Sequence, residues 1–294
     1  MNYYAAIDVG TNSIRMLIAK TDGKEIVTER MLLQSTRLGE DLTKTGNLSF
    51  LAMERTVKAL KEFQTYLAEY SPKSVSIIAT SAVREAGNSD EFINMVKAET
   101  GFRLKVISGE EEARLSYLGA SRGISTDKPI VLVDIGGGST EIVYLKDSSL
   151  TGRSFPVGAV RCSEKGTTPT QVFDVLENTL EEVKKIGSFQ LVTVGGTATT
   201  LAAVVKQLAV YDPKQVHGSK VTLHELTRVL FDLGSKDIKE RKKVPGLQPE
   251  RADIIIAGLI ILWVIMTYLE CEIVVVSEAD ILHGLVFDSY LNIN

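Results

Sequence analysis

Two related stretches organise this chain: Asp8-Val9-Gly10-Thr11-Asn12-Ser13 and Asp134-Ile135-Gly136-Gly137-Gly138-Ser139-Thr140-Glu141. Both contain the pattern Asp-x-Gly-x-x-Ser, and each stands between two apolar runs. After the first copy, Ile14, Met16 and Ile18 fall on one face of an alternating run, so each copy predicts a strand, a glycine turn and a second strand. A hairpin used twice in one chain indicates a tandem pair of similar domains rather than a solenoid.

Between and after the two hairpins, strand and helix patterns alternate, which predicts the α/β class. The expected further strands cover residues 25–33, 75–79, 104–107, 191–194 and 272–276. The expected helices cover residues 51–70, 92–99, 110–118, 172–186, 196–208, 223–233 and 254–269, with a closing helix from 279.

The composition is that of an ordinary globular protein with enough chain for about two domains. Of 294 residues, 44% are hydrophobic and 24% are charged, and there are only 7 prolines, which excludes disordered and linker-dominated classes. The net charge of −4 argues against a nucleic-acid partner bound by an overall basic field. An anionic ligand would have to be held by locally placed cations and backbone amides.

The two cysteines, Cys162 and Cys271, lie far apart and have no His or Cys at metal spacing, so neither a disulfide framework nor a zinc site is expected. The amino terminus lacks the pattern of a signal peptide, and we expect a cytoplasmic protein. The apolar stretch 254–269 is too short to span a bilayer. It predicts a core helix, and no membrane association is expected.

The glycine turns predict a phosphate site. Three consecutive glycines permit the close backbone approach that phosphate oxygens require, and an Asp beside such a turn can bind a metal. Taken alone, Asp8 to Ser13 is also explained by an Asx turn. A third turn, Val194-Gly195-Gly196-Thr197, opens a helix and aims amide donors at a ligand, although a tight connection explains it too. The candidate phosphate-binding residues of the three turns are Thr11, Asn12, Ser13, Gly136, Gly137, Gly138, Ser139, Gly195, Gly196 and Thr197.

Acidic residues in Ser108-Gly109-Glu110-Glu111-Glu112 are explained in part by a helix start, where they complement the dipole. If Ser108 is the N-cap, Glu111 closes a capping box and Glu112 is left without that role. Glu112 is therefore the candidate general base acting on water.

Four arginines are candidate phosphate ligands, because guanidinium groups match phosphate oxygens. Arg15 follows the first turn, and Arg84 lies past a predicted strand end, where ligand sites open in α/β sheets. Arg161 and Arg251 are weaker candidates, and each arginine alone is also explained as a surface ion-pair partner.

With these residues assembled, the chain resembles the exopolyphosphatase and guanosine pentaphosphate phosphohydrolase (Ppx/GppA) family, within the superfamily of acetate and sugar kinases, heat-shock chaperones and actin. The resemblance spans nearly the whole chain. It is carried, in the family's order, by the segments 8–13, 79–84, 107–115, 134–141 and 194–197.

The resemblance implies two ribonuclease-H-like (actin-like ATPase) domains with a central cleft, one formed by residues 1–124 plus 277–294 and the other by 125–276. It implies Mg²⁺-assisted hydrolysis of the terminal phosphoanhydride of inorganic polyphosphate or guanosine pentaphosphate, and a homodimer as a family-level expectation. Glu112 aligns with the catalytic glutamate, while Asp134 and Glu141 align with acidic residues that hold metal or position the nucleophile. Asp8 is a further candidate metal ligand, and Arg84 would bind a phosphate further along the substrate.

The chain departs from the family pattern in two places. The carboxy-terminal His-Asp-type helical domain of the longer members is not found by residue 294, which favours short polyphosphates as substrates. Leu282-His283 stands where the family has Arg-Glu. Two further hypotheses stay open: a kinase of the same superfamily, and a polyphosphate- or nucleotide-binding regulator without turnover.

Overall fold

The computed structural model describes residues 2–147 and 149–293, which form two compact units. Unit 1 contains Met1–Gly119 and Ile281–Asn294, and unit 2 contains Ala120–Asp280. Each unit is built on one mixed sheet with helices, as the alternating pattern predicts.

The sheet of unit 1 has the order β3-β2-β1-β4-β5. The first three strands, β1 (Asn2–Val9), β2 (Ile14–Thr21) and β3 (Ile26–Gln34), are antiparallel neighbours. The next two, β4 (Ser74–Ala79) and β5 (Lys105–Val106), run parallel to β1. The carboxyl ends of β1, β4 and β5 therefore meet at one edge of the sheet, which is where ligand sites form in such folds.

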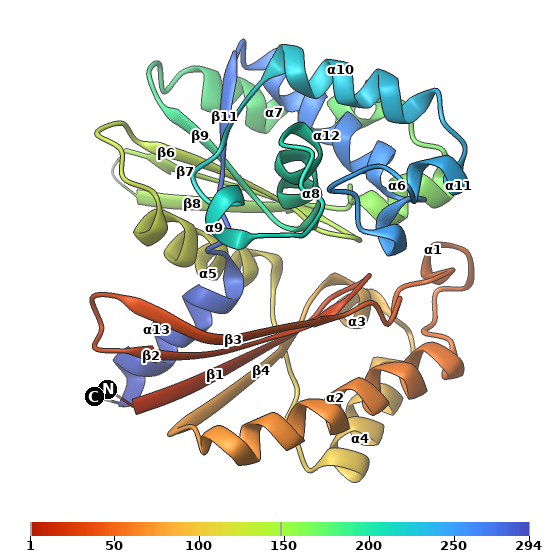
Figure 1. Cartoon of the computed structure of the whole chain (residues 1–294), viewed down its shortest axis with the longest axis vertical. Helices are drawn as coiled ribbons and strands as arrows, with labels where there is room; N and C mark the ends of the chain where they lie inside the picture. Colours follow the sequence, from red (N-terminus) through yellow and green to blue (C-terminus); the bar gives the residue numbers. More distant parts are fainter. Residues whose placement is uncertain (1, 148, 294) are drawn as a thin grey trace. The chain divides into compact units, whose positions relative to one another are not determined.

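The helices of unit 1 cover both faces of its sheet (Figure 1). Alternate residues of β1 enter two different cores: Ala5 and Ile7 pack with the helices α2 and α4, whereas Tyr4 and Ala6 pack with the helix α13. This period of two follows from the pleat of a strand, and burial on both faces explains the uninterrupted apolar run of β1. The helices are α1 (Leu42–Thr45), α2 (Phe50–Tyr70), α3 (Ser81–Glu85), α4 (Ser89–Thr100), α5 (Gly109–Gly123) and α13 (Ile281–Ile293). The last residues of α5, from Ala120 on, belong to unit 2.

The sheet of unit 2 has the order β10-β11-β9-β6-β7-β8. The parallel strands are β6 (Ile130–Ile135), β9 (Gln190–Val194) and β11 (Ile273–Val276), and antiparallel strands flank them on both sides. The flanking strands are β7 (Thr140–Lys146), β8 (Ser149–Phe155) and β10 (Lys220–Thr222).

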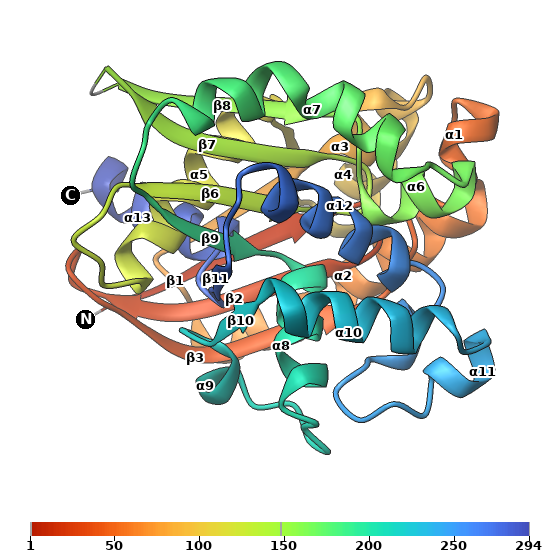
Figure 2. The same ribbon diagram turned by 90° about the horizontal axis from the view of Figure 1, so that it is seen from above.

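The helices of unit 2 pack around one large apolar core, and Figure 2 shows α7 running along β7 and β8. They are α6 (Ala159–Lys165), α7 (Pro169–Lys184), α8 (Gly196–Val205), α9 (Pro213–Val216), α10 (Leu223–Gly234), α11 (Ile238–Arg241) and α12 (Ile255–Tyr268), with a 3₁₀ turn at Pro249–Arg251. The apolar α12 packs against α6, α7, α8 and α10, so it is the core helix that the sequence predicts. Within residues 2–147 and 149–293, every helix falls short of the length or the apolar character that a membrane crossing requires.

Several elements were not predicted. Strand β8 has the sequence Ser-Leu-Thr-Gly-Arg-Ser-Phe, which lacks alternation because an edge strand is only partly buried. The elements β10, α1, α3, α6, α9 and α11 contain three to seven residues each, too few for a clear period. The prediction that α8 continues to Leu208 is wrong. The helix ends at Val205. Gln207 adopts a left-handed conformation with φ of 52°, and the Leu208 N–H donates to the Ala203 carbonyl, which is a common way for a helix to end.

Candidate active site

The two glycine turns have the same internal geometry. In unit 1 the Gly10 N–H donates to the Ser13 carbonyl at 3.1 Å, and in unit 2 the Gly136 N–H donates to the Ser139 carbonyl at 3.0 Å. Both turns join antiparallel strands at the edge where the parallel strands end. The repeated hairpin of the sequence is thus a repeated structure.

In the first turn the carbonyl groups are occupied by the protein. The Thr11 carbonyl accepts from the Gly39 N–H at 2.8 Å, and the Asn12 carbonyl accepts from the Arg37 N–H at 2.9 Å. The N–H groups of Thr11, Asn12 and Ser13 donate to no acceptor among the described residues. A turn with its carbonyl groups occupied and its N–H groups available is suited to bind an anion.

The second turn shows the same division. Its Gly136 and Gly137 carbonyls accept from backbone N–H groups at the start of α6, at 2.8 to 3.1 Å, and the Arg161 Nε donates to the Gly138 carbonyl at 2.7 Å. The N–H groups of residues 137–139 have no acceptor within the described part of the chain. Arg161, a candidate phosphate ligand in the sequence, therefore braces the glycine turn.

The third glycine turn lies against the second. Gly195 has φ of 89°, and a side chain on it would stand 2.9 Å from the Ile135 carbonyl oxygen and 3.0 Å from Asp134 Oδ1. Only glycine fits both conditions without a shift. Gly196 begins α8 beneath the Arg251 guanidinium, whose atoms lie 2.0 to 2.2 Å from the place of a Cβ on Gly196. Unit 2 thus brings Arg251 to the N-terminus of α8, where a guanidinium and amide donors together suit an anion, and it places Asp134 beside Gly195.

The residues that face the two aspartates across the hairpins differ in charge. In unit 1 Asp8 pairs with Arg15 in register, and Arg15 Nη2 binds Asp8 Oδ2 at 2.7 Å. In unit 2 Asp134 pairs in register with Glu141, which is buried and accepts from Ser154 Oγ at 2.6 Å. Hence the second hairpin sets two carboxylates opposite each other, and the first sets a carboxylate opposite a guanidinium.

The pair Asp134 and Glu141 fits a magnesium ion. No three acidic, histidine or cysteine side chains converge as a metal site in the described ranges, but Mg²⁺ commonly uses one or two carboxylates and completes its shell with water and substrate phosphate. Cross-strand neighbours have Cβ atoms about 5 Å apart, within reach of one ion. Asp8, the third predicted metal ligand, lies in unit 1 and is bound to Arg15.

The three glutamates that begin α5 lie in different environments. Glu110 is exposed, Glu111 binds Lys105 Nζ at 2.6 Å, and Glu112 is only 8% exposed. The Ser108 hydroxyl accepts from the Glu111 N–H at 3.1 Å, which is the predicted N-cap bond. Among the three, Glu112 is the residue turned into the protein.

Glu112 is held by Arg84. The Nη1 atom of Arg84 binds Glu112 Oε2 at 2.9 Å and also donates to the Ile107 carbonyl at 3.0 Å. Arg84 lies in α3 after β4, and Glu112 lies in α5 after β5. Arg84 and Glu112 thus follow the carboxyl ends of two successive parallel strands. Arg84, which was predicted to bind phosphate, forms an ion pair with the predicted base Glu112.

At the same edge of unit 1, Ser81 was not predicted as a site residue, whereas Asn12 was a candidate phosphate ligand. Ser81 Oγ hydrogen-bonds Thr11 Oγ1 at 2.9 Å and so joins the first glycine turn to α3. Nearby in sequence, Asn12 is 6% exposed, and its Nδ2 atom has no hydrogen-bond partner among the described residues. A buried amide donor without an acceptor lowers the stability of the fold. An anion that accepts a hydrogen bond from this donor would compensate for the loss.

Three residues of unit 2 were also missed. Glu278 follows the end of β11, and Tyr211 donates a hydrogen bond to Glu278 Oε1. Thr193, near the end of β9, has a buried hydroxyl without a partner in the described ranges. The rule that ligands bind at the carboxyl ends of parallel strands would have directed attention to residues 193 and 278.

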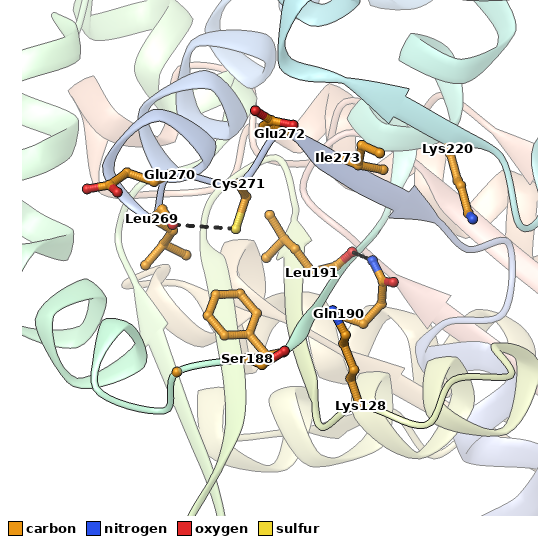
Figure 3. Close-up of a pocket in the computed structure, with 12 residues that line it drawn as sticks. Lys128, Ser188, Gln190, Leu191, Lys220, Leu269, Glu270, Cys271, Glu272 and Ile273 are labelled. Carbon is orange, nitrogen blue, oxygen red and sulfur yellow. Dashed lines mark hydrogen bonds between the residues drawn. The ribbon is translucent and has the colours of Figure 1, made fainter.

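A cavity of about 370 Å³ lies at the opposite edge of the unit 2 sheet (Figure 3). It is lined by Lys128, Gln190 and Ile273, which stand at the amino ends of β6, β9 and β11, and by Cys271 and the exposed Lys220. None of the predicted site residues lines it. The cavity is therefore distinct from the glycine turns.

Comparison with known proteins agrees with this arrangement of turns and strands. Residues 17–293 match the model of the Ppx/GppA phosphatase family. The chain belongs to the Ppx/GppA phosphatase family. Family membership indicates a hydrolase of phosphoanhydride bonds.

Family relatives differ in total length. The chain is 34% identical to Exopolyphosphatase 2 of Mycobacterium tuberculosis, with 96% of both chains covered. It is 35% identical to the bifunctional 3-dehydroquinate synthase/phosphatase of Fusobacterium nucleatum, and the match covers 98% of this chain and 46% of that protein. The chain thus spans about half the length of this second relative.

A solved structure of the Ppx/GppA family supports the fold. The crystal structure of the Aquifex aeolicus family member has a TM-score of 0.82 and 31% sequence identity, covering 100% of this chain and 99% of the other. The expected ribonuclease-H-like architecture, with two α/β units and mixed sheets, is confirmed.

Proposed function

We propose that this Ppx/GppA protein is an exopolyphosphatase that removes the terminal orthophosphate from inorganic polyphosphate. The observation that carries the proposal is the pair of glycine turns whose carbonyl groups are occupied while the N–H groups of residues 11–13 and 137–139 have no acceptor within the described chain. Polyphosphate presents a row of anionic oxygens, and two such turns with Arg251 and the start of α8 offer donors to several of them. The likeness to Exopolyphosphatase 2 supports the same substrate class.

In the proposed reaction Glu112 removes a proton from water, and the water oxygen attacks the terminal phosphorus. The bridging P–O bond breaks, the oxygen leaves on the shortened chain, and the proton stays on the Glu112 carboxylate. Arg84 holds that carboxylate by its Oε2 atom, which fixes its direction. The protein forms no covalent bond to the substrate in this scheme, because phosphoryl transfer depends chiefly on positioning and charge stabilisation.

Asp134 and Glu141 would hold Mg²⁺, the cofactor that the resemblance implies. When bound, the ion neutralises charge on the transferred phosphoryl group and the leaving oxygen. Arg15 holds Asp8 in the first turn, so we assign the metal to Asp134 and Glu141. The turn residues Thr11, Asn12, Ser13, Gly137, Gly138 and Ser139, with Thr197 in α8, are assigned to phosphate binding, and Gly136 closes the turn through its bond to Ser139.

The experiment is orthophosphate release from polyphosphates of several lengths and from guanosine pentaphosphate, with and without Mg²⁺. We expect orthophosphate release from polyphosphate, and we expect this release to require Mg²⁺. The series of polyphosphate lengths tests the expected preference for short chains. Faster release from guanosine pentaphosphate would assign the alternative substrate. Transfer to an acceptor instead of water would indicate a kinase, and saturable binding without release would indicate a regulator.

Glu112→Gln tests the proposed base. General base catalysis contributes about 10²- to 10⁴-fold, so kcat should fall by about that factor while the variant stays folded. Glu111→Gln is the matched control, because Glu111 is the preceding residue of the same helix and pairs with Lys105 on the exterior. Wild-type turnover of folded Glu112→Gln would contradict the assignment.

A further inference from the structure

Two hydroxyl groups of unit 1 meet where the parallel strands β1 and β4 end. Val9 and Ala79 are the last paired residues of these two strands, and Thr11 and Ser81 each follow two residues later. Thr11 Oγ1 and Ser81 Oγ lie 2.9 Å apart, and the two residues are only 6% and 3% exposed. The pair therefore lies at the carboxyl ends of parallel strands, where ligands bind in such sheets.

The Thr11 side chain is also held by Gly39. The Gly39 N–H donates to the Thr11 carbonyl at 2.8 Å, and a Cβ on Gly39 would stand 2.4 Å from Thr11 Cγ2. Because its methyl group packs on Gly39 and its hydroxyl binds Ser81, the β-branched Thr11 is held in one rotamer. A side chain that is already fixed loses less conformational entropy when it binds a ligand.

The hydroxyl pair keeps one hydrogen that the protein does not use. Two hydroxyl groups carry two hydrogens, and the bond between them uses one. Neither Thr11 Oγ1 nor Ser81 Oγ has a second hydrogen-bond partner within residues 2–147 and 149–293. Whichever oxygen donates to the other, one O–H hydrogen stays without a protein acceptor. This hydrogen gains a bond when an acceptor enters the first glycine turn.

The other available groups of this turn are donors as well. The N–H groups of Thr11, Asn12 and Ser13 donate to no acceptor in the part of the chain that the structure describes. Asn12 Nδ2 is buried and likewise has no partner there. A ligand that satisfies these donors together must present several acceptor oxygens, as an ionised phosphoryl group does.

We propose that Ser81 is a positioning residue of the phosphate site. Its hydroxyl donates to Thr11 Oγ1, and this bond directs the Thr11 hydroxyl hydrogen to a phosphoryl oxygen of the substrate. The inference deepens the proposed function and rests on it, since it takes phosphate binding by the first turn as given. Ser81 thus contributes to substrate affinity and takes no part in the proton transfer to Glu112.

The test measures the Kd of inorganic tripolyphosphate by calorimetry on the full chain without Mg²⁺, and the KM and kcat of orthophosphate release with Mg²⁺. Ser81→Ala should raise Kd and KM about two- to tenfold, which is the effect of one lost neutral hydrogen bond. Its kcat should change little, because the ion pair between Arg84 and Glu112 uses neither hydroxyl.

Thr11→Val tests whether the two hydroxyl groups act as a unit. Valine keeps the shape of threonine and removes the donor that we assign to the phosphoryl oxygen. The Kd should rise about tenfold or more, because a hydrogen bond to a charged group is lost. Adding Ser81→Ala to Thr11→Val should raise Kd no further, because Ser81 acts through the Thr11 hydroxyl.

Ser76→Ala is the matched control. Ser76 Oγ lies 2.7 Å from Ser289 Oγ, so this variant breaks the same kind of bond in the same unit. Ser76 belongs to β4, as the strand that leads to Ser81, but it lies outside the glycine turn. Its Kd and KM should equal those of wild type, and urea unfolding should show that both serine variants are folded.

The possible results separate the two proposals. Unchanged Kd and KM in Ser81→Ala, equal weakening in Ser76→Ala, or a further rise in Kd when Ser81→Ala is added to Thr11→Val would overturn the role of Ser81. Binding of tripolyphosphate without release in Mg²⁺ would overturn the proposed hydrolysis, and the Kd series would still test Ser81. If wild type neither binds nor hydrolyses tripolyphosphate, both proposals fail.

Discussion

Asn12 and Asn88 are two asparagines of unit 1 with opposite hydrogen-bond states. The side chain of Asn88 bonds both the N–H and the carbonyl of Leu48, at 2.8 and 3.0 Å. Asn12 Nδ2 is buried and has no partner among the described residues. A donor that is satisfied only by a ligand serves binding at the expense of stability.

Asn12→Ala should therefore leave the free energy of unfolding of the free protein within about 1 kcal/mol of wild type, or raise it, because it removes an unsatisfied donor. The KM for polyphosphate should rise several-fold. Asn88→Ala should do the reverse, with a loss of about 1 to 3 kcal/mol and an unchanged KM. Urea unfolding and phosphate release on both variants check this, and a stability loss in Asn12→Ala with unchanged KM would contradict it.

Single residues differ in how far the sequence predicts their roles. Glu112 was separable from Glu111 because a helix start assigns the third residue to capping, and the structure buries Glu112 and leaves Glu111 at the exterior. Tyr211 was not predictable, because its partner Glu278 is 67 residues away. No spacing rule connects a tyrosine in one loop with a glutamate after a strand.

At the scale of elements, the second glycine turn depends on the loop that precedes α6. A Cβ on Gly158 would stand 2.5 Å from the Gly137 carbonyl oxygen and 2.6 Å from two backbone carbons of the turn. Backbone atoms cannot move aside as a flexible side chain can. Gly158 therefore lets α6 bring its N–H groups onto the carbonyl groups of residues 136 and 137.

Gly158→Ala should displace the second turn, with a stability loss of about 1 to 3 kcal/mol from overpacking and a clear rise in KM. Gly234→Ala is the control, since Gly234 ends α10 and no atom lies within 4 Å of its would-be Cβ. That variant should keep the wild-type KM. Equal KM values for the two variants would show that the turn tolerates displacement.

Glu182 joins α7 to β7 and β8. It accepts from the Tyr144 hydroxyl at 2.7 Å, from Lys146 at 3.2 Å and from Arg153 at 2.9 Å. The hydrogen bond from Tyr144, followed by those charges, lowers the pKa of Glu182 from 4.5 to about 2. The pKa of Glu182 is lower in the folded state, so the ionised Glu182 carboxylate stabilises the fold. This contribution is complete above pH 4.5 and is lost as the pH falls towards 2.

Glu182→Gln should consequently be less stable than wild type at neutral pH, and the difference should shrink between pH 4.5 and pH 2. Urea unfolding at a series of pH values measures it. Glu177→Gln, an exposed position on the same helix, should show no such trend. A Glu182→Gln deficit that stays constant down to pH 2 would contradict the assigned cause.

The predictability of the elements follows their burial. Strands β1 and β6 and the helices α2 and α12 have long buried apolar patterns, and all were predicted within a few residues. The strand β8 and the short helices were missed, because edge and surface positions leave little pattern in the sequence. The glycine turns were predicted as turns, but the occupancy of their carbonyl groups depends on Gly39, Arg37 and α6, which only the folded chain brings to them.

At the scale of the whole molecule, one hairpin design serves two units with different chemistry. The paired position opposite the first aspartate is Arg15, and opposite the second it is Glu141. Unit 1 adds Glu112 with its arginine, and unit 2 adds the helix start of α8 with Arg251. Unit 1 thus carries the proposed base, and unit 2 carries the proposed metal ligands.

The repeat was predictable from the two copies of the glycine motif, and the α/β class from the alternating strand and helix patterns. The family was predictable because five segments occur in the family's order, which is specific where one segment is not. The cytoplasmic location and the homodimer stay predictions. The release assay decides between polyphosphate and guanosine pentaphosphate, because both substrates carry the phosphate groups that we propose the turns bind.

The most direct test of terminal hydrolysis is cleavage of tripolyphosphate in ¹⁸O-labelled water with Mg²⁺, followed by mass spectrometry of both products. If water attacks the terminal phosphorus, the label enters the released orthophosphate and the pyrophosphate stays unlabelled. Glu112→Gln should slow the appearance of labelled orthophosphate about 10²-fold or more, and Glu111→Gln should not. Label in the pyrophosphate alone, or no orthophosphate at all, would contradict the account.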